Sequence, residues 1–475
     1  MSTIDPKDQR IAELEAQVEL LTKKLDAALR IIALQAKRIE DLEARLGLNS
    51  SNSSKPPSSD PPSSSRPSKP PSGKKPGGQR GHQRSIRPLV APDFIHELKP
   101  PRCKSCQRAL NGDDPAPIRH QVTEIPRIRP TVTEYRLHEL SCPCGKLTRA
   151  PLPEGVPSGA FGPVLMSTVA LFTTRYRQSK RLAQEFLATF LNVDISHGAI
   201  CKIEQRTSSA IAAPVEEARL FVQQQPVVNG DETGWPEGKA DGRKLMAWLW
   251  VATTPLVTVF LIARSRGEAI AKKLLGDKFN GIFGSDRWKA YDWLNAVMRQ
   301  LCWAHLIRDF QSWVDRKGSS AWVGEALLVQ VEKMFEWWAK LNAQQLTREQ
   351  FQEQMEPVRE EILRLLKVAR DGEDKKPAGM AKAMLKLEHG LFTFVDEEGV
   401  EPTNNASERA LRPGVIQKKL TFGTESEKGS RFVERMLTVT TTLRQQNRDV
   451  LGFLISAHEA QIKGALADSL LPATP

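Results

Sequence analysis

The chain has 475 residues, which are too many for one hydrophobic core, so we expect roughly two to four domains. Lys and Arg outnumber Asp and Glu by 68 to 56, and the net charge of +12 favours a polyanionic partner, most often nucleic acid. We expect no membrane association and a reducing, cytoplasmic setting. The N-terminal sequence MSTIDPKDQR lacks an apolar signal core, no apolar run approaches the roughly 18 residues that span a bilayer, and six cysteines are too few for a disulfide scaffold.

Residues 11–46 carry a heptad repeat. The a positions are Ile11, Val18, Leu25, Ile32, Ile39 and Leu46, and the d positions are Leu14, Leu21, Ala28, Gln35 and Leu42. β-branched residues at a with leucine at d favour a parallel two-stranded coiled coil, in which Gln35 would help to set the register. We therefore predict a coiled coil over residues 1–48 that makes the protein a homodimer or a higher oligomer. The alternative is an amphipathic helix that packs on its own chain.

The composition changes abruptly over residues 49–88. This stretch is mostly Ser, Pro, Gly and cations, with eight Lys or Arg residues against one acid, Asp60. Such a segment cannot bury enough apolar surface to offset the entropy lost on ordering, so we predict a disordered basic linker. It could neutralise phosphates without contacting bases, or it could be a solvated linker that binds nothing.

Two close pairs of cysteines follow, Cys103 with Cys106 and Cys142 with Cys144. Four thiolates suit tetrahedral zinc, and the first pair has the usual spacing of a zinc knuckle. The second pair is tighter than usual, which makes His138 an alternative ligand. Residues 118–140 alternate like two strands joined at a proline. We therefore predict a small ribbon with structural zinc over residues 89–150; four thiols without metal are the alternative.

Residues 151–225 are predicted to be helical. Within them, residues 175–207 have the pattern of a helix, a short turn and a second helix, with Ser196 as the N-cap of the second. This pattern resembles a DNA-binding helix-turn-helix, although ordinary helical pairs share it. The cations that would support DNA contact are Arg175, Arg177, Lys180 and Arg181.

From residue 226 the pattern changes to β-strands. We predict strands at 226–230, 244–252, 256–263, 281–285 and 298–304, and helices at 267–279 and 289–297. Asp231 follows the first strand and Asp286 follows the fourth. Carboxylates are the ligands that Mg²⁺ prefers, and two ions about 3.5–4 Å apart can activate the attacking oxygen and stabilise the leaving oxygen at a phosphodiester. A third carboxylate is then expected on a helix beside the sheet.

Residues 404–413, NNASERALRP, are the candidate for that helix. Asn404 or Asn405 is predicted to be the N-cap, Glu408 lies in the first turn, and Pro413 is predicted to end or kink the helix. Glu408 would be the third metal ligand. The alternative is a surface ion pair between Glu408 and Arg412, four residues along the helix.

Cations surround and follow Glu408. Phosphate contacts are predicted there in preference to a solvated basic face. The predicted DNA-binding residues are Arg409, Arg412, Lys418, Lys419 and Arg431. Before Glu408, Cys302 and His305 form a Cys-x-x-His sequence. It could be a helix start with a core thiol, or His305 could position DNA or water near the metal ions.

Seven motifs occur in one order along nearly the whole chain. They are LGLNSSNSSKPPSSD (46–60), PGGQRGH (76–82), GDETGW (230–235), SDRWKAY (285–291), CWAHLIRDF (302–310), NNASERALRP (404–413) and QKKLTFGTESEKGSRF (417–432). In these motifs the chain resembles the transposases of the bacterial insertion sequence 66 family.

The resemblance implies a ribonuclease H-like catalytic domain with an Asp-Asp-Glu triad. The triad falls on Asp231, Asp286 and Glu408, which would hold two Mg²⁺ ions, with Mn²⁺ as a substitute. Glu232 is an alternative ligand, although strand alternation directs it to the other face of the sheet. The resemblance also implies small accessory proteins encoded by the same element.

The predicted fold is a multidomain chain with an α/β ribonuclease H-like core, preceded by the coiled coil, the zinc ribbon and the helical DNA-binding region. Asp286 and Glu408 are far apart in the sequence, so a helical insertion is predicted between two parts of the core. The remaining boundaries are 226–305 for the first part of the core, 306–400 for the insertion, 401–450 for the second part and 451–475 for a C-terminal helix and tail.

The predicted function is that of a bacterial, nucleoid-associated DNA transposase. It would hydrolyse phosphodiesters at the terminal repeats of its element in an Mg²⁺-dependent reaction and transfer the freed strand to target DNA. A catalytically inactive DNA-binding regulator derived from a mobile element is one alternative. A metal nuclease that cuts without joining is another.

Overall fold

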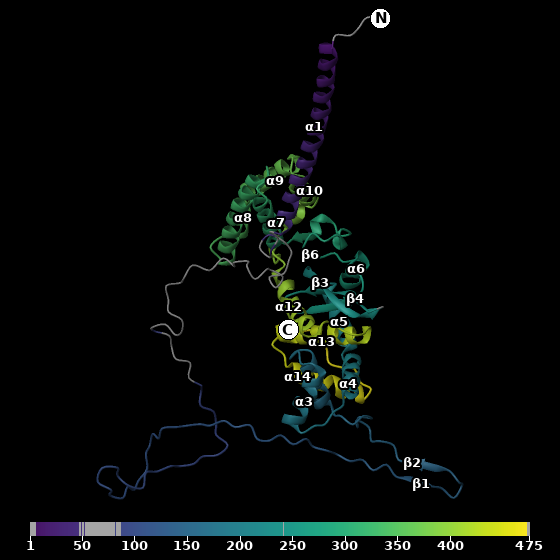
Figure 1. The fold of residues 1–475 in the computed structure, drawn as a ribbon. Helices are drawn as coiled ribbons and strands as arrows, with labels where there is room; N and C mark the ends of the chain where they lie inside the picture. The colour runs from purple at the N-terminus through teal and green to yellow at the C-terminus, as the bar shows by residue number, and fades with distance from the viewer. Residues whose placement is uncertain are drawn as a thin grey trace. The chain divides into compact units, whose positions relative to one another are not determined.

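The computed structural model describes residues 6–46, 49, 52, 81, 87–240 and 242–472. The described residues form 14 α-helices, seven β-strands in two sheets, and short 3₁₀ turns (Figure 1). The linker predicted over residues 49–88 lies almost wholly outside the described residues. The chain divides into two units. One is drawn from Met1–Ser64, Glu134–Glu185 and Ile195–Pro475, and the smaller one from Ser65–Thr133 and Phe186–Asp194.

The first helix, α1 (Pro6–Leu46), runs unbroken for 41 residues. Its heptad side chains are exposed, and those described are Leu14, Val18, Leu21, Leu25, Ile32, Ile39, Leu42 and Leu46. Apolar surface in water is unfavourable, so this stripe leaves hydrophobic energy available for association. None of the described helices combines the length and the apolar character that crossing a membrane requires.

The two strands predicted between the cysteine pairs are absent from the described residues 118–138. Strands β1 (Glu139–Ser141) and β2 (Leu147–Arg149) instead form a hairpin around the second cysteine pair. The alternation of apolar and polar residues was misleading because the apolar side chains do not face a core. Val122 is 79% exposed and Val132 is 88% exposed. Prolines in the segment also remove the amide donors that a strand ladder needs.

The smaller unit is held by few polar contacts. The side chain of Gln121 donates to the Val90 carbonyl oxygen at 2.7 Å and accepts from the Val90 amide at 3.1 Å. The side chain of Asn192 donates to the carbonyl oxygen of Ile128 at 2.7 Å. Most other side chains of this unit are exposed, so it has little core of its own.

The helices predicted over residues 151–225 are present. They are α2 (Pro163–Thr173), α3 (Lys180–Leu191), α4 (His197–Ala210) and α5 (Ala212–Val222). The predicted N-cap is confirmed, because the Ser196 hydroxyl accepts a hydrogen bond from the Ala199 amide at 3.2 Å. A turn after α3 therefore leads directly into a capped α4.

The larger sheet has five strands in the order β5-β4-β3-β6-β7. β3 pairs antiparallel with β4, and β4 with β5, whereas β3-β6 and β6-β7 are parallel pairs. The bounds are β3 (Val227–Ala240), β4 (Arg243–Thr253), β5 (Thr258–Ala263), β6 (Ile282–Ser285) and β7 (Arg299–Leu301), with α6 (Glu268–Leu275) between β5 and β6. A strand is present in each of the five predicted places, and the hairpin between β4 and β5 is confirmed. The strand predicted at 298–304 is shorter than expected, because it ends at Leu301 and α7 begins at Trp303.

Two local predictions in this region are wrong. β3 does not end before Asp231, because its pairing with β4 continues as far as Ala240. The helix predicted at 289–297 is replaced by 3₁₀ turns at Lys289–Tyr291 and Ala296–Met298. The side chain of Asn295 accepts from the Val297 amide and so starts a new turn within the predicted helix.

Helix α13 (Glu427–Gln445) covers the outer edge of β5. Side chains four residues apart on the helix accept from alternate amides of the strand: Thr442 from Thr258 at 3.1 Å, Thr438 from Phe260 at 3.0 Å, and Glu434 from Ile262 at 2.6 Å. The spacings fit because four helical residues advance about 6 Å and two strand residues about 7 Å. The helix thus satisfies an edge that would otherwise invite another strand.

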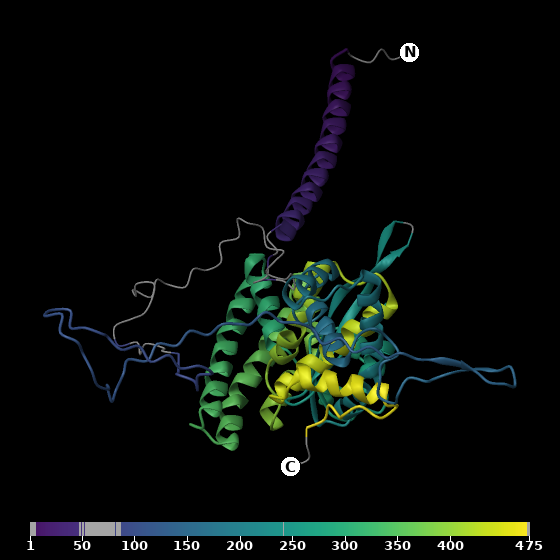
Figure 2. The same cartoon turned by 90° about the horizontal axis from the view of Figure 1, so that it is seen from below.

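The other edge of the sheet is covered by α11 (Glu388–Asp396), the last helix of the insertion. The Thr393 hydroxyl donates to the Arg299 carbonyl oxygen at 2.6 Å, and the Phe394 amide donates to the Gln300 side chain at 2.8 Å. The insertion also contains α7 (Trp303–Asp315), α8 (Ala321–Asn342), α9 (Arg348–Asp371) and α10 (Lys375–Lys386). Helices α8 and α9 lie side by side (Figures 1 and 2).

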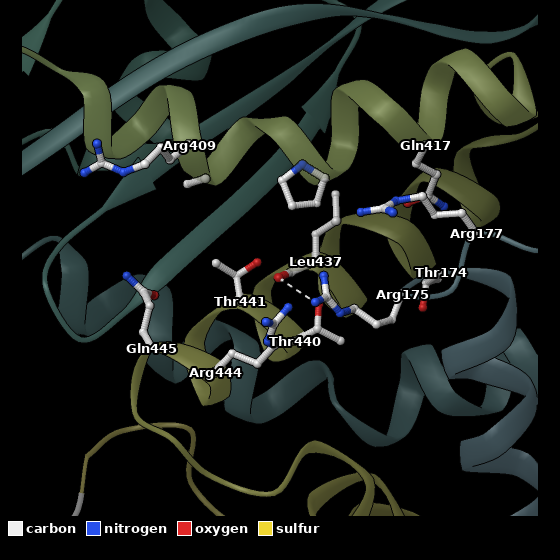
Figure 3. Close-up of a pocket in the computed structure, with 12 residues that line it drawn as sticks. Thr174, Arg175, Arg177, Arg409, Gln417, Leu437, Thr440, Thr441, Arg444 and Gln445 are labelled. Atoms are coloured by element: carbon white, nitrogen blue, oxygen red, sulfur yellow. Dashed lines mark hydrogen bonds between the residues drawn. The ribbon is translucent and has the colours of Figure 1, made fainter. Parts of the chain in front are cut away.

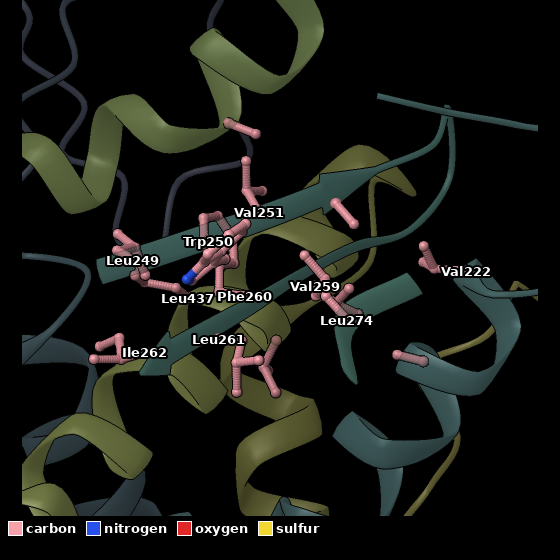
Figure 4. Close-up of a cluster of buried hydrophobic side chains, with 14 of the residues drawn as sticks. Val222, Leu249, Trp250, Val251, Val259, Phe260, Leu261, Ile262, Leu274 and Leu437 are labelled. Carbon is pink, nitrogen blue, oxygen red and sulfur yellow. The ribbon is translucent and has the colours of Figure 1, made fainter. Parts of the chain in front are cut away.

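Two hydrophobic clusters fill the larger unit. The first joins β4 and β5 to the helices around them, including α14 (Val450–Ile462), and Figure 4 shows side chains from it. The second lies mainly within the insertion and reaches the sheet at Leu301. Helix α12 (Asn405–Thr421) packs on β3 and β4. A Cβ atom at Gly414 would lie only 2.4 Å from Leu249, so this close packing requires glycine.

Glu434 makes the edge contact sensitive to pH. Burial raises its pKa to about 7, against the opposing effects of Arg431 and the Ile262 amide. Because the folded pKa lies above the ordinary value of 4.5, its contribution to stability is complete below pH 4.5 and is lost as the pH rises through about 7. Glu434→Gln removes this titration. We expect the stability difference, wild type minus variant, to fall by up to about 3 kcal/mol between roughly pH 5 and pH 8.

Urea unfolding at both pH values measures this difference, and Glu425→Gln, an exposed substitution, is the control. A difference that does not change with pH would show that Glu434 is ionised throughout.

Candidate catalytic site

Two aspartates lie near the ends of the paired parts of adjacent parallel strands. Asp231 lies within β3, and Asp286 directly follows β6. Asn229 of β3 pairs with Gly284 of β6, so each aspartate comes two residues after this pair. Burial, followed by the negative charges of Glu232, Asp286 and Glu408, raises the pKa of Asp231 well above its ordinary value.

Glu232 is directed to the opposite face of β3. Asp231 pairs across the sheet with Val251, whereas Glu232 pairs with Trp250. The Glu232 carboxylate is fully buried, lies 2.7 Å from Nη2 of Arg266 and accepts the Tyr291 hydroxyl at 2.6 Å. Burial and the charge of Asp286 raise the pKa of Glu232, and Tyr291 and Arg266 oppose that rise. Glu232 is therefore satisfied within the protein and does not face the aspartate pair.

The position of Asp286 depends on an aromatic and cationic stack. The Trp288 amide donates to Oδ1 of Asp286 at 2.9 Å, and the Trp288 indole donates to the Arg266 carbonyl oxygen at 2.9 Å. The Arg266 guanidinium lies 3.8 Å from the ring centroid of Trp288 and 4.6 Å from that of Trp248. Glu232, Arg266, Trp288 and Asp286 thus form one connected network. Arg266 lies outside the motifs noted in the sequence, although Trp288 and Tyr291 lie in the SDRWKAY motif.

Asn404 connects the start of α12 to the strand that carries Asp231. It occupies the predicted N-cap position, but its buried side chain donates to the Gly230 carbonyl oxygen at 3.2 Å and does not cap the helix. The backbone amide of Asn404 donates to the Cys302 sulfur at 3.3 Å. Of the two outcomes predicted for Pro413, an end or a kink of the helix, the end is wrong and the kink stays a prediction. The helix continues to Thr421 because its packing on the sheet outweighs the lost hydrogen bond.

Glu408 projects from the first turn of α12 towards α7. Its Oε1 atom lies 3.6 Å from Nη2 of Arg308 and 3.9 Å from Nδ1 of His305. Burial and the charge of Arg308 lower the pKa of His305, against the effects of Asp286 and Glu408. Its Nδ1 is buried and has no hydrogen-bond partner among the described residues. His305 is therefore a neutral imidazole beside the third carboxylate.

Cys302 is the N-cap residue of α7 and is almost fully buried. Burial raises the pKa of its thiol to about 11, so the thiol stays neutral. Cys302 is therefore a core thiol at the start of a helix, as one of the two interpretations of the Cys-x-x-His sequence proposed. His305 lies 3.9 Å from Glu408, and its positioning of DNA or water stays a prediction.

The predicted phosphate-contacting cations divide into two groups. Arg409, Arg412 and Lys419 are exposed. Lys418 donates to the Thr233 hydroxyl and to the Gly234 carbonyl oxygen, both at 2.7 Å, and so holds α12 on β3. Arg431 donates to the Ile262 carbonyl oxygen and pairs with Glu434 at 3.1 Å. The second group is therefore occupied by internal contacts.

Each cysteine pair lies in its own short turn. The Gln107 amide donates to the Cys103 carbonyl oxygen at 3.0 Å, and the Gly145 amide donates to the Cys142 carbonyl oxygen at 2.8 Å. Backbone hydrogen bonds from Cys106 and Ser105 lower the pKa of Cys103, and one from Lys146 lowers that of Cys144. These turns favour thiolates. Among the residues that the structure describes, no three His, Cys, Asp or Glu side chains are grouped closely enough to hold a metal ion.

Comparison with known proteins identifies two matching families. The model of the family described as "Transposase IS66 family" matches residues 158–431, more than half of the chain, and this span includes Asp231, Asp286 and Glu408. A family of unknown function (DUF6444) matches residues 3–88.

Two relatives come from Sinorhizobium fredii (strain NBRC 101917 / NGR234). Uncharacterized protein y4hP is 25% identical over 408 residues, which cover 75% of this chain and 70% of the relative. Uncharacterized protein y4qI is 26% identical over 253 residues, which cover 48% of this chain and 46% of the relative. Neither printed name states a function.

The Glu232–Arg266 pair leads to a prediction about stability. Arg266→Ala leaves a fully buried carboxylate with only the Tyr291 hydroxyl as a partner, so we expect it to lower the free energy of unfolding by about 3 kcal/mol. Arg364→Ala, which removes an exposed ion pair with Glu361, should cost less than about 1 kcal/mol. Urea unfolding of the two variants measures both values, and equal losses would show that Glu232 does not depend on Arg266.

Proposed function

The chain belongs to the IS66 transposase family, and we propose that it is the DNA transposase of an insertion sequence, cutting and joining DNA with divalent metal ions. The observation that carries the proposal is the placement of Asp231 on β3 and of Asp286 directly after the adjacent parallel strand β6, with Glu408 on a helix that is held to β3. All three acids lie inside the span that the family model matches.

We assign the catalytic core to residues 226–305 and 401–450, interrupted by the insertion at 306–400. The first hydrophobic cluster supports this division because it combines residues from both parts of the core, such as Phe283 and Leu437. The second cluster is built mainly from the insertion. The mixed five-stranded sheet, with two antiparallel and two parallel pairings, supports the ribonuclease H-like architecture that the family resemblance implies.

Asp231, Asp286 and Glu408 would hold two Mg²⁺ ions, or Mn²⁺ in their place. The donor chemistry fits, because all three side chains offer hard carboxylate oxygens, and because burial and neighbouring negative charge raise the pKa of Asp231, an effect that a divalent cation would offset. When bound, such ions activate an attacking oxygen and stabilise a leaving one. The neutral His305 imidazole next to Glu408 would orient the attacking water, and the exposed Arg409 and Arg412 would neutralise phosphate.

The proposed reaction has two in-line displacements at one site. Water attacks a phosphodiester at the end of the element, the P–O bond to the 3′ oxygen breaks, and a free 3′-hydroxyl results. That hydroxyl then attacks a phosphorus of the target DNA, and the 3′ oxygen of the target leaves. The carboxylates form no covalent intermediate, so they would contribute only by holding the metal ions.

DNA would also contact the helical region of residues 151–225. Helix α4 packs against α2, α13 and α14, which supports a rigid placement. Its exposed side chains, which remain free for DNA, include Lys202, Gln205, Arg206 and Ser209. The structural zinc ion predicted on Cys103, Cys106, Cys142 and Cys144 stays a prediction, and each pair lies in its own short turn.

An inactive DNA-binding regulator is less well supported, because Asp231, Asp286 and Glu408 are all present within the span that the family model matches. A metal nuclease that cuts without joining would share the site, and recovery of joined DNA products separates it from a transposase. The family resemblance also implies small accessory proteins encoded by the same element, and we propose them as partners.

The triad proposal is tested by charge-neutral substitutions. Asp231→Asn, Asp286→Asn and Glu408→Gln should each reduce Mg²⁺-dependent cleavage of a labelled DNA carrying the element's own end to the level without metal, because each removes a metal ligand. Binding of the same DNA, measured by gel shift, should stay near that of the wild type. Glu401→Gln, an exposed acid just before α12, is the control. Near-normal cleavage by any triad variant would remove that residue from the site.

The exposed heptad stripe of α1 supports self-association through a coiled coil. We expect the double variant Leu21→Glu and Leu25→Glu to convert a dimer or larger species into a monomer, because it places charge at adjacent d and a positions. Light scattering after size exclusion measures the mass. Arg30→Glu, at an exposed f position, should leave the mass unchanged, and an unchanged mass in the double variant would refute the coiled coil.

A further inference from the structure

A cavity of about 290 Å³ lies between α12, α13 and the segment that follows α2 (Figure 3). Four arginines from these three elements line it: Arg175, Arg177, Arg409 and Arg444. We call this the arginine pocket. No Asp or Glu is among its lining residues. The family resemblance and the sequence motifs gave no reason to bring Arg175 and Arg177 together with the catalytic helix.

The four cations are left without counterions. In the described part of the chain, none of their guanidinium groups forms a hydrogen bond or an ion pair. Other arginines of the same unit are paired, as Arg266 is with Glu232 and Arg308 with Glu408. Like charges around one cavity repel each other, and a bound anion would reverse that repulsion.

One further feature indicates a ligand. Gln417 lines the pocket, is 3% exposed, and has an amide oxygen without a hydrogen-bond partner among the described residues. Turning the amide would present its NH₂ group to an anion.

The chemistry of the lining favours phosphate. Guanidinium groups match the oxygens of a phosphate with pairs of parallel hydrogen bonds. The volume lies at the lower end of the range for small-molecule sites, about 300–1,000 Å³, so the pocket suits one phosphate group with part of its sugar. Arg409 directly follows Glu408, so a phosphate held here lies within a few nucleotides of the proposed cleavage site.

We propose that the arginine pocket binds one backbone phosphate of the DNA strand that lies at Glu408. This inference rests on the proposed function, since it takes DNA as the substrate. The pocket acts by position: it fixes the strand along α12, and Glu408 on the neighbouring face of the same helix would help to hold the metal ions at the scissile phosphate.

The test compares the arginine pocket of wild-type sequence with the double variant Arg177→Gln and Arg444→Gln. Both full-length proteins also carry Glu408→Gln, so that no DNA is cut. The control is Arg364→Gln with Arg370→Gln, which removes the same charge from exposed sites. Binding is measured on DNA of the element's end in which single phosphates are replaced, one at a time, by neutral methylphosphonates. In the wild-type pocket and in the control, a methylphosphonate at one position of the DNA should lower the binding affinity about tenfold. In the pocket variant, the same replacement should not lower the affinity.

The salt dependence gives a second readout. Loss of one phosphate contact should reduce the slope of log K against log salt by about 0.9 in the pocket variant and leave the control unchanged. Circular dichroism and the melting temperature check folding. Where the double variant does not fold, the exposed Arg409→Gln takes its place.

Inorganic phosphate distinguishes the sources of the ligand. If phosphate raises the melting temperature of wild type but no DNA position responds differently in the variant, the pocket is a free-anion site and the proposal is overturned. The unmodified protein, which keeps Glu408, is tested separately for DNA cleavage. If it cuts DNA but the methylphosphonate profiles with and without the pocket substitutions coincide, the pocket inference fails and the proposed function stands. A single responsive position in a protein that never cuts DNA supports the pocket and rejects the transposase.

Discussion

The repulsion among carboxylates at the centre of the sheet is the constraint on which the rest of the site depends. Burial, followed by the negative charges of Glu232, Asp286 and Glu408, raises the pKa of Asp231. The fold neutralises Glu232 internally with Arg266 and Tyr291. Asp231 and Asp286 each accept a hydrogen bond from a backbone amide, and Glu408 lies 3.6 Å from Nη2 of Arg308. Under the proposed function, bound metal ions would supply the positive charge that the two aspartates lack.

The surrounding elements hold those three acids in position without entering the site. Asn404 fastens the start of α12 to the strand of Asp231, Lys418 fastens the end of the same helix to that strand, and Gly414 allows close approach between them. At the sheet edges, α13 and α11 supply side-chain partners for strand amides and carbonyls. Because both edges are covered by helices from the same chain, the sheet is closed to further strands.

The sequence predicted the features whose signal is local. Alternation and turns located five strands, the hairpin and Ser196, and two aspartates at strand ends suggested the carboxylate pair. It failed where a partner distant in the sequence decides the outcome. β3 is long because β4 pairs with it, and the helix at 289–297 is absent because Asn295 starts a new turn. Arg266 was not recognisable, since its function depends on Glu232 and Trp288, which only the fold brings together.

Helix α12 explains how one short segment can serve opposite charges. Consecutive residues on a helix point about 100° apart. Glu408 therefore faces Arg308 and His305, while Arg409 turns to the arginine pocket. Under the proposed function, the face of α12 that carries Glu408 would bind metal ions and the face that carries Arg409 would bind phosphate. Glu408 does not pair with the arginines of the pocket, and its Oε1 atom lies 3.6 Å from Nη2 of Arg308 instead. On that proposal, metal binding and the position of the DNA strand would depend on each other.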